Sequence, residues 1–366
     1  MINEPIMLSL MSLFTMLSFF TIFLTHKIFS KHSKILIDKD FKKPQAFHTE
    51  PIARSGGLAS FVSFITFILI YKFFFQTILI EFLVISTSIF IIGFLDDIKI
   101  NLSPKIRLFL MIFAIYFSIL FLDINLISVD LKFLEFLLDN KTFNILFILL
   151  CFLFIINGTN LIDGFNGLVG IHLLIINLIL MFININSENY QIALIIIAQI
   201  IILTSFLLFN FPKAKLFLGD SGSYLFGALL VLNVINTNNS NPGISSFFFC
   251  VILFYLFFEV FFSFFRKLYL KKSPLKPDSN HLHMLTFKLL TSFKKFKDCN
   301  YLNSILINFV YLMLILPTFF FKDNGIFCRY WFFSLLIIYL IFYLKLYRFK
   351  NINFLQKNSR KNSQIR

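Results

Sequence analysis

Charged residues are scarce in this chain. Asp, Glu, Lys and Arg make up 14% of its 366 residues, whereas a soluble domain carries about 25%. Hydrophobic residues make up 58%, and apolar runs of about 20 residues, each long enough to cross a bilayer, recur from end to end. This composition excludes a separate soluble domain and indicates a helical protein that crosses a membrane many times.

The chain also lacks a cysteine pattern, an internal repeat and a structured linker. Its four cysteines are scattered without a CxxC pair, so they predict neither a metal site nor a disulfide framework. The first apolar run, 5–25, has no basic residue before it and no small-residue cleavage site after it, which favours a retained span over a signal peptide. We expect one membrane domain over residues 1–346 and a basic cytoplasmic tail over 347–366.

The apolar runs predict an all-α polytopic membrane protein with about eleven transmembrane helices. Because eleven is odd, the two termini are expected on opposite sides of the membrane. The predicted spans are 5–25, 56–71, 77–95, 106–122, 143–162, 167–182, 191–209, 222–235, 244–265, 303–321 and 330–343.

The basic residues orient these spans. All but five of the 33 Lys and Arg fall in one alternating set of loops and in the C-terminal tail, and short basic loops face the cytoplasm. The N-terminus is therefore predicted to be periplasmic and the C-terminus cytoplasmic. Because the net charge of +15 lies in short loops between spans, it indicates topology and not a nucleic-acid partner. The five exceptions are Lys72, Lys132, Lys141, Lys322 and Arg329.

Five polar stretches fall on the predicted cytoplasmic face. A polar group left in hydrocarbon costs several kcal/mol, so each stretch must face water or bind a ligand. The stretch NGTNLIDGFNGL, at 157–168, directly follows an apolar run. The other four lie at 43–57, 93–107, 215–223 and 273–285.

Two of these stretches carry acids in unusual settings. Asp96 and Asp97 end the third predicted span; such a pair is either solvated or, at the edge of a span, functional. Asn160, Asp163 and Asn166 recur at intervals of three, which on a continuing helix would place them on one face. Gly164 and Gly167 instead favour a loop in which backbone N–H groups can reach a ligand. A helix cap needs one or two such residues, so the excess favours a ligand site.

Two further stretches add a hard oxygen ligand and histidines. Asp220 begins the eighth predicted span and is either an N-cap or a Mg²⁺ ligand. His281 and His283 lie in the most basic loop, which suggests an anionic substrate. Glu259 precedes Arg266 by seven residues, about two helical turns, so the two share a face and could pair locally.

Together these groups fit a metal-assisted reaction of phosphates at the cytoplasmic membrane surface. The tetrapeptide GDSG also surrounds the nucleophile of trypsin-like proteases, but here it leads into a membrane helix, which excludes that interpretation. No zinc-ligand spacing is present. A transporter of an anionic solute and a catalytically inactive scaffold are the rival interpretations.

The stretches, in this order, resemble the polyprenyl-phosphate N-acetylhexosamine-1-phosphate transferases of the glycosyltransferase 4 family over roughly residues 38–285. The resemblance implies transfer of an N-acetylhexosamine-1-phosphate from a UDP-sugar to polyprenyl (undecaprenyl) phosphate, with release of UMP. This step starts a lipid-linked cell-envelope glycan such as O-antigen. It also implies Mg²⁺, with Mn²⁺ as an alternative, and a multi-pass location in the bacterial inner membrane with the active site on the cytoplasmic face. It leaves a homodimer open.

The resemblance further implies roles for individual residues. Asp96, Asp97 and Asp163 match catalytic positions, and Asp220 and Asn160 match metal-ligand positions. The positions that match substrate-binding residues are Lys105, Asn166, His281, His283, His48 and Arg54.

Three departures from the family pattern leave the sugar and the branch open. Met284 stands at the last position of an H-x-H-H motif, Asn166 stands where many members have Asp, and Gln45 begins a variant of the segment before His48. The undecaprenyl-phosphate GlcNAc-1-phosphate transferases are the nearer branch. A muramyl-pentapeptide substrate is disfavoured, because the lipid I synthases carry a different His-rich loop.

Overall fold

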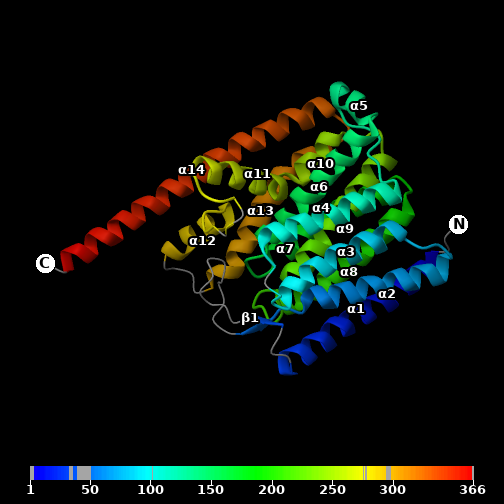
Figure 1. Ribbon diagram of the computed structural model, residues 1–366, viewed down its shortest axis with the longest axis horizontal. Helices are drawn as coiled ribbons and strands as arrows, with labels where there is room; N and C mark the ends of the chain where they lie inside the picture. The colour runs from blue at the N-terminus through cyan, green and yellow to red at the C-terminus, as the bar shows by residue number, and fades with distance from the viewer. Residues whose placement is uncertain are drawn as a thin grey trace.

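Long helices make up most of the protein (Figure 1). A computed structural model describes residues 4–32, 36–38, 51–100, 102–274, 276, 278–293 and 298–364. The helices are α1 (Glu4–His32), α2 (Gly56–Phe75), α3 (Ile80–Asp97), α4 (Pro104–Leu122), α5 (Lys132–Leu138), α6 (Lys141–Ile162), α7 (Leu168–Asn186), α8 (Tyr190–Asn210), α9 (Gly219–Ser240), α10 (Ser246–Ile252), α11 (Phe254–Tyr269), α12 (Leu282–Ser292), α13 (Cys299–Phe320) and α14 (Gly325–Gln364).

Each predicted span falls on a helix, but fewer helices qualify as spans by length and composition. Within the described residues, eight helices are long and apolar enough to cross a membrane, or nine if α10 and α11 count as one span. These two helices occupy the predicted span 244–265, which is bent by 71° between them. The protein is therefore an all-α polytopic membrane protein, and the count of eleven spans and their orientation stay predictions.

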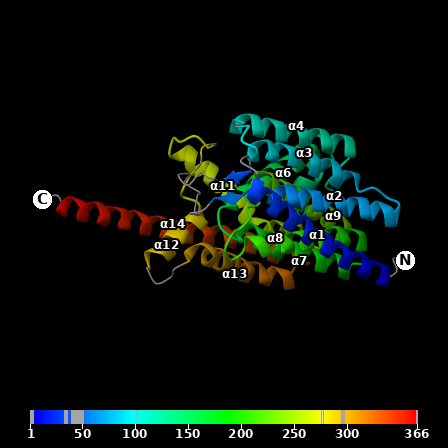
Figure 2. The ribbon, with the colours of Figure 1, turned by 90° about the horizontal axis from the view of Figure 1, so that it is seen from below.

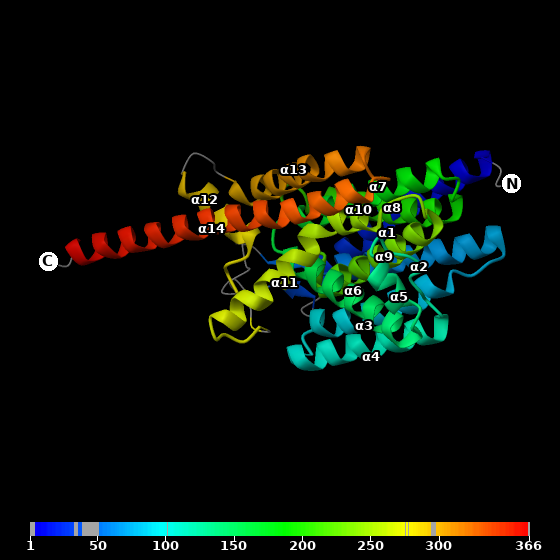
Figure 3. The ribbon, with the colours of Figure 1, turned by 90° about the horizontal axis from the view of Figure 1, so that it is seen from above.

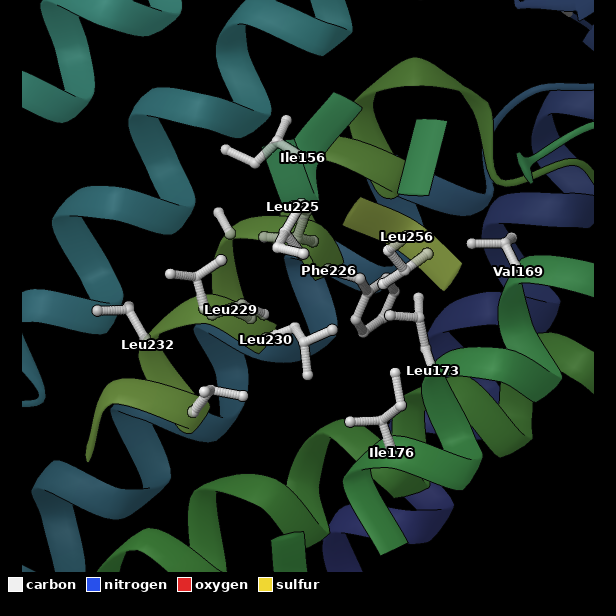
Figure 4. Close-up of a cluster of buried hydrophobic side chains, with 14 of the residues drawn as sticks. Ile156, Val169, Leu173, Ile176, Leu225, Phe226, Leu229, Leu230, Leu232 and Leu256 are labelled. Carbon is white, nitrogen blue, oxygen red and sulfur yellow. The ribbon is translucent and has the colours of Figure 1, made fainter. Parts of the chain in front are cut away.

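Helix α9 contains the predicted span 222–235 but is not among the eight helices that qualify as spans by length and composition. It packs against α2, α3, α6 and α7, and Figure 4 shows its side chains Phe226 and Leu229 among those of the neighbouring helices. Because α9 lies inside protein, its polar residues bond to other helices and not to lipid. Asn233 Nδ2 donates to Asn177 Oδ1 on α7 at 3.1 Å and to Gln199 Oε1 on α8 at 2.8 Å.

The two ends of the bundle differ. Figures 1 to 3 place α12 and the end of α11 near one end of the bundle, which we call the α12 end, and the N-terminus at the other end. Helix α14 continues past the α12 end to Gln364, so helix covers most of the tail predicted at 347–366. By the charge asymmetry of the loops, the α12 end is the predicted cytoplasmic face.

A small β-structure interrupts the helical fold at the α12 end. Strands β1 (Ile37–Asp38) and β2 (Ile52–Ala53) pair antiparallel, with Ile37 opposite Ala53. Ala53 also forms a parallel bridge with Leu216. This pairing ties the segment before α2 to the segment before α9, although Ala53 and Leu216 are 163 positions apart in the sequence.

Candidate active site

The end of α3 meets the start of α9 at the α12 end. Asp97, the last residue of α3, accepts hydrogen bonds from the backbone N–H groups of Asp220 at 3.0 Å and Ser221 at 2.9 Å. The Ser221 hydroxyl donates to the same carboxylate at 2.5 Å. The first N–H groups of a helix have no partner inside it and favour a negative charge. Asp97 therefore stabilises the start of α9 and fixes the position of Asp220.

Glycines allow this close approach. Gly219 has a φ of +76°, and a Cβ there would lie 2.7 Å from both carboxylate oxygens of Asp97. A Cβ on Gly57 would lie 2.3 Å from the backbone nitrogen of Gly222, and one on Gly93 would lie 2.6 Å from the Cα of Ser221. Small residues let helix backbones converge in this way. The glycines thus bring α2, α3 and α9 together at the site.

Arg107 and Asn160 complete the surroundings of Asp220. The Arg107 guanidinium lies 2.7 Å from Asp96 Oδ2 and 3.0 Å from Asp220 Oδ2. Asn160 Nδ2 donates to Asp220 Oδ1 at 2.9 Å and to the Ser223 hydroxyl at 3.1 Å. The first turns of α4 and the last turn of α6 therefore converge on the first turn of α9.

Arg54 supplies a second guanidinium. It lies 3.1 Å from Asp38 and 3.8 Å from Asp97, and its charge also acts on Asp163 and Asp220. Backbone bonds fix the segment that follows it, because Gly56 N donates to Phe217 O at 3.0 Å and Gly57 N to Leu218 O at 2.8 Å. We call Asp96, Asp97, Asp163 and Asp220 the acid cluster; two guanidinium groups lie within its reach.

Asp163 caps the end of α6. Burial raises the pKa of its carboxyl group to about 7; the Arg54 charge opposes this shift, and the charges of Asp220 and Asp97 add to it. A carboxyl group with this pKa gains and loses a proton near neutral pH, as a general acid or base must.

The acid cluster fits Mg²⁺ better than a metal that needs a full set of protein ligands. No three His, Cys, Asp or Glu residues of the described part of the chain are arranged to hold a metal ion. Mg²⁺ instead binds through one or two carboxylates and completes its shell with water and substrate phosphates. The Asp220 carboxylate, with the Asn160 amide 2.9 Å away, offers such an incomplete donor set.

The histidines lie near the loop that follows Asp163. His281 Nδ1 is 3.0 Å from Glu259 Oε1, and His283 Nδ1 is 3.2 Å from the Tyr255 hydroxyl. Phe165, two residues after Asp163 in the α6–α7 loop, has its ring centroid 5.9 Å from that of His283. The loop that carries Asp163 therefore connects the acid cluster to the histidines.

Several predicted site residues are not brought to the acid cluster. Lys105 is exposed, and its side chain forms no hydrogen bond or ion pair with the described residues. Asn166 Nδ2 donates instead to Pro212 O at 3.0 Å, in the α8–α9 loop. His283 is fully buried. Their substrate-binding roles stay predictions. His48 and Gln45 lie outside the described residues.

The structure shows contacts that the sequence did not predict for three residues: Arg107, Ser221 and Glu259. Lys105 and Arg107 both follow the paired acids, but residues two apart on a helix point in different directions, so only one could face the cluster. The sequence alone does not indicate whether Lys105 or Arg107 faces the acid cluster. Glu259 and Arg266, which share a helix face and could have paired, have other partners: Glu259 bonds His281 and Arg266 bonds Asp278.

The chain is similar in sequence to known transferases. Residues 79–238 match the model of glycosyl transferase family 4. The chain is 28% identical over 258 residues to an undecaprenyl-phosphate α-N-acetylglucosaminyl 1-phosphate transferase of Thermotoga maritima. The aligned region covers 70% of this chain and 74% of that protein. It is 28% identical over 246 residues to a probable undecaprenyl-phosphate N-acetylglucosaminyl 1-phosphate transferase of Bacillus subtilis, with 64% and 66% covered.

A third relative belongs to another branch. The chain is 34% identical over 156 residues to a phospho-N-acetylmuramoyl-pentapeptide-transferase of Streptococcus sanguinis, which covers 38% of this chain and 45% of that protein. All four residues of the acid cluster lie inside the stretch that the family model matches, whereas the histidines lie outside it. Residues 79–238 of this chain match the model of the family that the resemblance predicted.

Proposed function

We propose that the chain transfers an N-acetylhexosamine-1-phosphate from a UDP-sugar to a polyprenyl phosphate in the inner membrane of a bacterium. One observation carries the proposal. Four carboxylates and two guanidinium groups, from segments far apart in the sequence, gather at the start of α9 on the predicted cytoplasmic face. Such a site can hold a diphosphate and move a proton at the membrane surface. The relatives named above are transferases, and no feature of the site favours a transporter.

The reaction replaces one phosphoanhydride with another. An oxygen of the lipid phosphate attacks the sugar-proximal phosphorus, and the bond from that phosphorus to the oxygen shared with UMP breaks. Asp96 and Asp163 are the acids placed to take a proton from the lipid phosphate, because both oxygens of Asp97 are engaged by the start of α9. Arg54 and Arg107 bind phosphate oxygens. Asp220 and Asn160 would hold Mg²⁺, which supplies charge neutralisation on the diphosphate.

A substrate panel tests this proposal. Membranes that contain the chain would be incubated with undecaprenyl phosphate, one of several UDP-N-acetylhexosamines, and Mg²⁺, Mn²⁺ or EDTA. We expect UMP and a lipid-linked sugar from one or two of the nucleotide sugars, and no product with EDTA. Absence of product from every sugar, with the protein folded and inserted, would overturn the proposal.

A further inference from the structure

Glu259 is a buried acid on α11 with three hydrogen-bond donors around it. Its Oε1 accepts from His281 Nδ1 and from the backbone N–H of Leu282, each at 3.0 Å. Its Oε2 accepts from the Tyr339 hydroxyl of α14. Glu259 is 1% exposed and His281 is 2% exposed. The carboxylate is thus fully engaged, and it holds both the ring of His281 and the start of α12.

The two histidines differ in what they can offer a ligand. His283 is fully buried, and burial lowers its pKa to about 3, so its ring is neutral. The rings of His281 and His283 stack in parallel, with centroids 5.5 Å apart. His283 therefore packs against one face of the His281 ring. His281 Nε2 forms no hydrogen bond with the described residues. His283 Nε2 also has no partner but is buried inside the protein, so His281 Nε2 is the ring nitrogen that we assign to the substrate.

Helix α14 reinforces the loop that carries His281. Tyr339 and Tyr343 are four residues apart, so they lie on one face of α14. The Tyr343 hydroxyl accepts from Arg266 at 2.6 Å, and the same guanidinium bonds Asp278 and the backbone oxygen of Asn280. Residues 278–283, which we call the histidine loop, are therefore fixed between α11 and α14.

We propose that Glu259 and Tyr339 are positioning residues for His281. The Glu259 carboxylate keeps a proton on Nδ1 and fixes the ring plane, so that Nε2 faces a phosphate oxygen of the nucleotide sugar. The tautomer and direction of a histidine are set by the hydrogen bond that its other nitrogen makes. This inference rests on the proposed transferase function, and it adds that the last helix of the bundle takes part in orienting the site.

A purely structural role for Glu259 makes a different prediction. If the carboxylate only capped α12 and filled the interior, its loss would lower the stability of the fold. The kcat of the molecules that remain folded would then be unchanged. Positioning instead predicts a change at the His281 ring itself and a lower kcat in folded protein.

The test combines ring NMR with kinetics. Protein labelled with ¹⁵N-histidine would be compared as wild type, Glu259→Gln and Tyr339→Phe, with the His281 signals assigned from His281→Gln. We expect the ¹⁵N shifts of His281 to show a proton on Nδ1 in the wild type and to change in Glu259→Gln. Tyr339→Phe removes a single hydroxyl, so it provides a milder variant should Glu259→Gln not fold.

Kinetic measurements then test whether the orientation of the His281 ring affects kcat. We expect Glu259→Gln to lower kcat at least about tenfold, as losses of orienting partners do, with little change in KM for the lipid phosphate. The double variant with His281→Gln should lose no more than His281→Gln alone, because the two residues act as a unit. Glu135→Gln, on exposed α5 at the other end of the bundle, is the matched control.

The outcomes separate the two proposals. Unchanged His281 shifts in Glu259→Gln, or a wild-type kcat in that variant, would overturn the positioning role. An inactive wild type would overturn the transferase function, and the NMR comparison would still decide whether Glu259 orients His281.

Discussion

Asp220→Asn is expected to lower the Mg²⁺-dependent transfer at least about a hundredfold, the size of effect seen when one preorganised electrostatic contact is lost. The Asp220 carboxylate faces Asn160 on one oxygen and Arg107 on the other. An amide at this position keeps the shape of the side chain but removes the charge that attracts a divalent cation. Its NH₂ group would also face either Asn160 Nδ2 or the Arg107 guanidinium, and because both of these are donors, one hydrogen bond would be lost. The rate of UMP release at saturating Mg²⁺ measures the effect.

A matched Asp→Asn change provides the control. Asp123 is exposed and pairs with Lys141 at 3.2 Å, after α4, away from the acid cluster. Asp123→Asn should reach the membrane in the same amount as Asp220→Asn and keep wild-type turnover, because exposed ion pairs contribute little. Wild-type activity in Asp220→Asn would remove this residue from the metal site.

Asp97→Asn is expected to impair both the fold and the chemistry. Three donors from the start of α9 converge on the two oxygens of Asp97. An Asn offers one oxygen, so at least one donor to a charged acceptor is lost inside the protein, which costs about 1.5–3 kcal/mol. Because the same contacts place Asp220, we expect kcat to fall about a hundredfold or more, with a smaller change in the affinity for the UDP-sugar.

The neighbouring acid separates the two roles. Asp96 has a side chain that is 22% exposed and pairs with Arg107, so Asp96→Asn should lower kcat with little loss of thermal stability. A thermal unfolding midpoint measured in detergent, beside the turnover of each variant, tests this difference. Wild-type stability in Asp97→Asn, or loss of UDP-sugar affinity alone, would contradict the account of Asp97.

That the polar site residues lie close together could be predicted from the sequence, because a membrane confines polar stretches to its two faces. Lys and Arg distribution assigned the polar stretches to one face, and the structure brings the residues 96–97, 160–163 and 220 together there. The long helices were also predictable from the apolar runs, whereas the short helices α5 and α12 were not predicted. The number of membrane-spanning helices stays a prediction, because α9 carries Asn233 and other polar groups that bond to neighbouring helices, and hydropathy alone does not decide whether such a helix spans.

Contacts between distant segments account for what the sequence could not decide. Arg107 reaches Asp220 across 113 residues, and nothing in the local pattern of α4 selects it over Lys105. Asn166 has the spacing of Asn160 and Asp163, but the expected loop at Gly164 and Gly167 is present. Gly167, at a φ of +78°, directly precedes α7, so the three residues do not share a helix face. Glu259 and Arg266 do share a face of α11, yet the histidine loop supplies each with a partner.

Transfer of the β-phosphate is the measurement that tests the central claim most directly. UDP-GlcNAc, or whichever UDP-sugar proves active, would be labelled with ³²P at the β-phosphate and incubated with undecaprenyl phosphate and wild-type membranes. The account predicts that the label enters the lipid fraction and that unlabelled UMP is released. Label released as UDP, with sugar alone reaching the lipid, would show that the bond broken lies on the sugar side of the phosphate and would contradict the account.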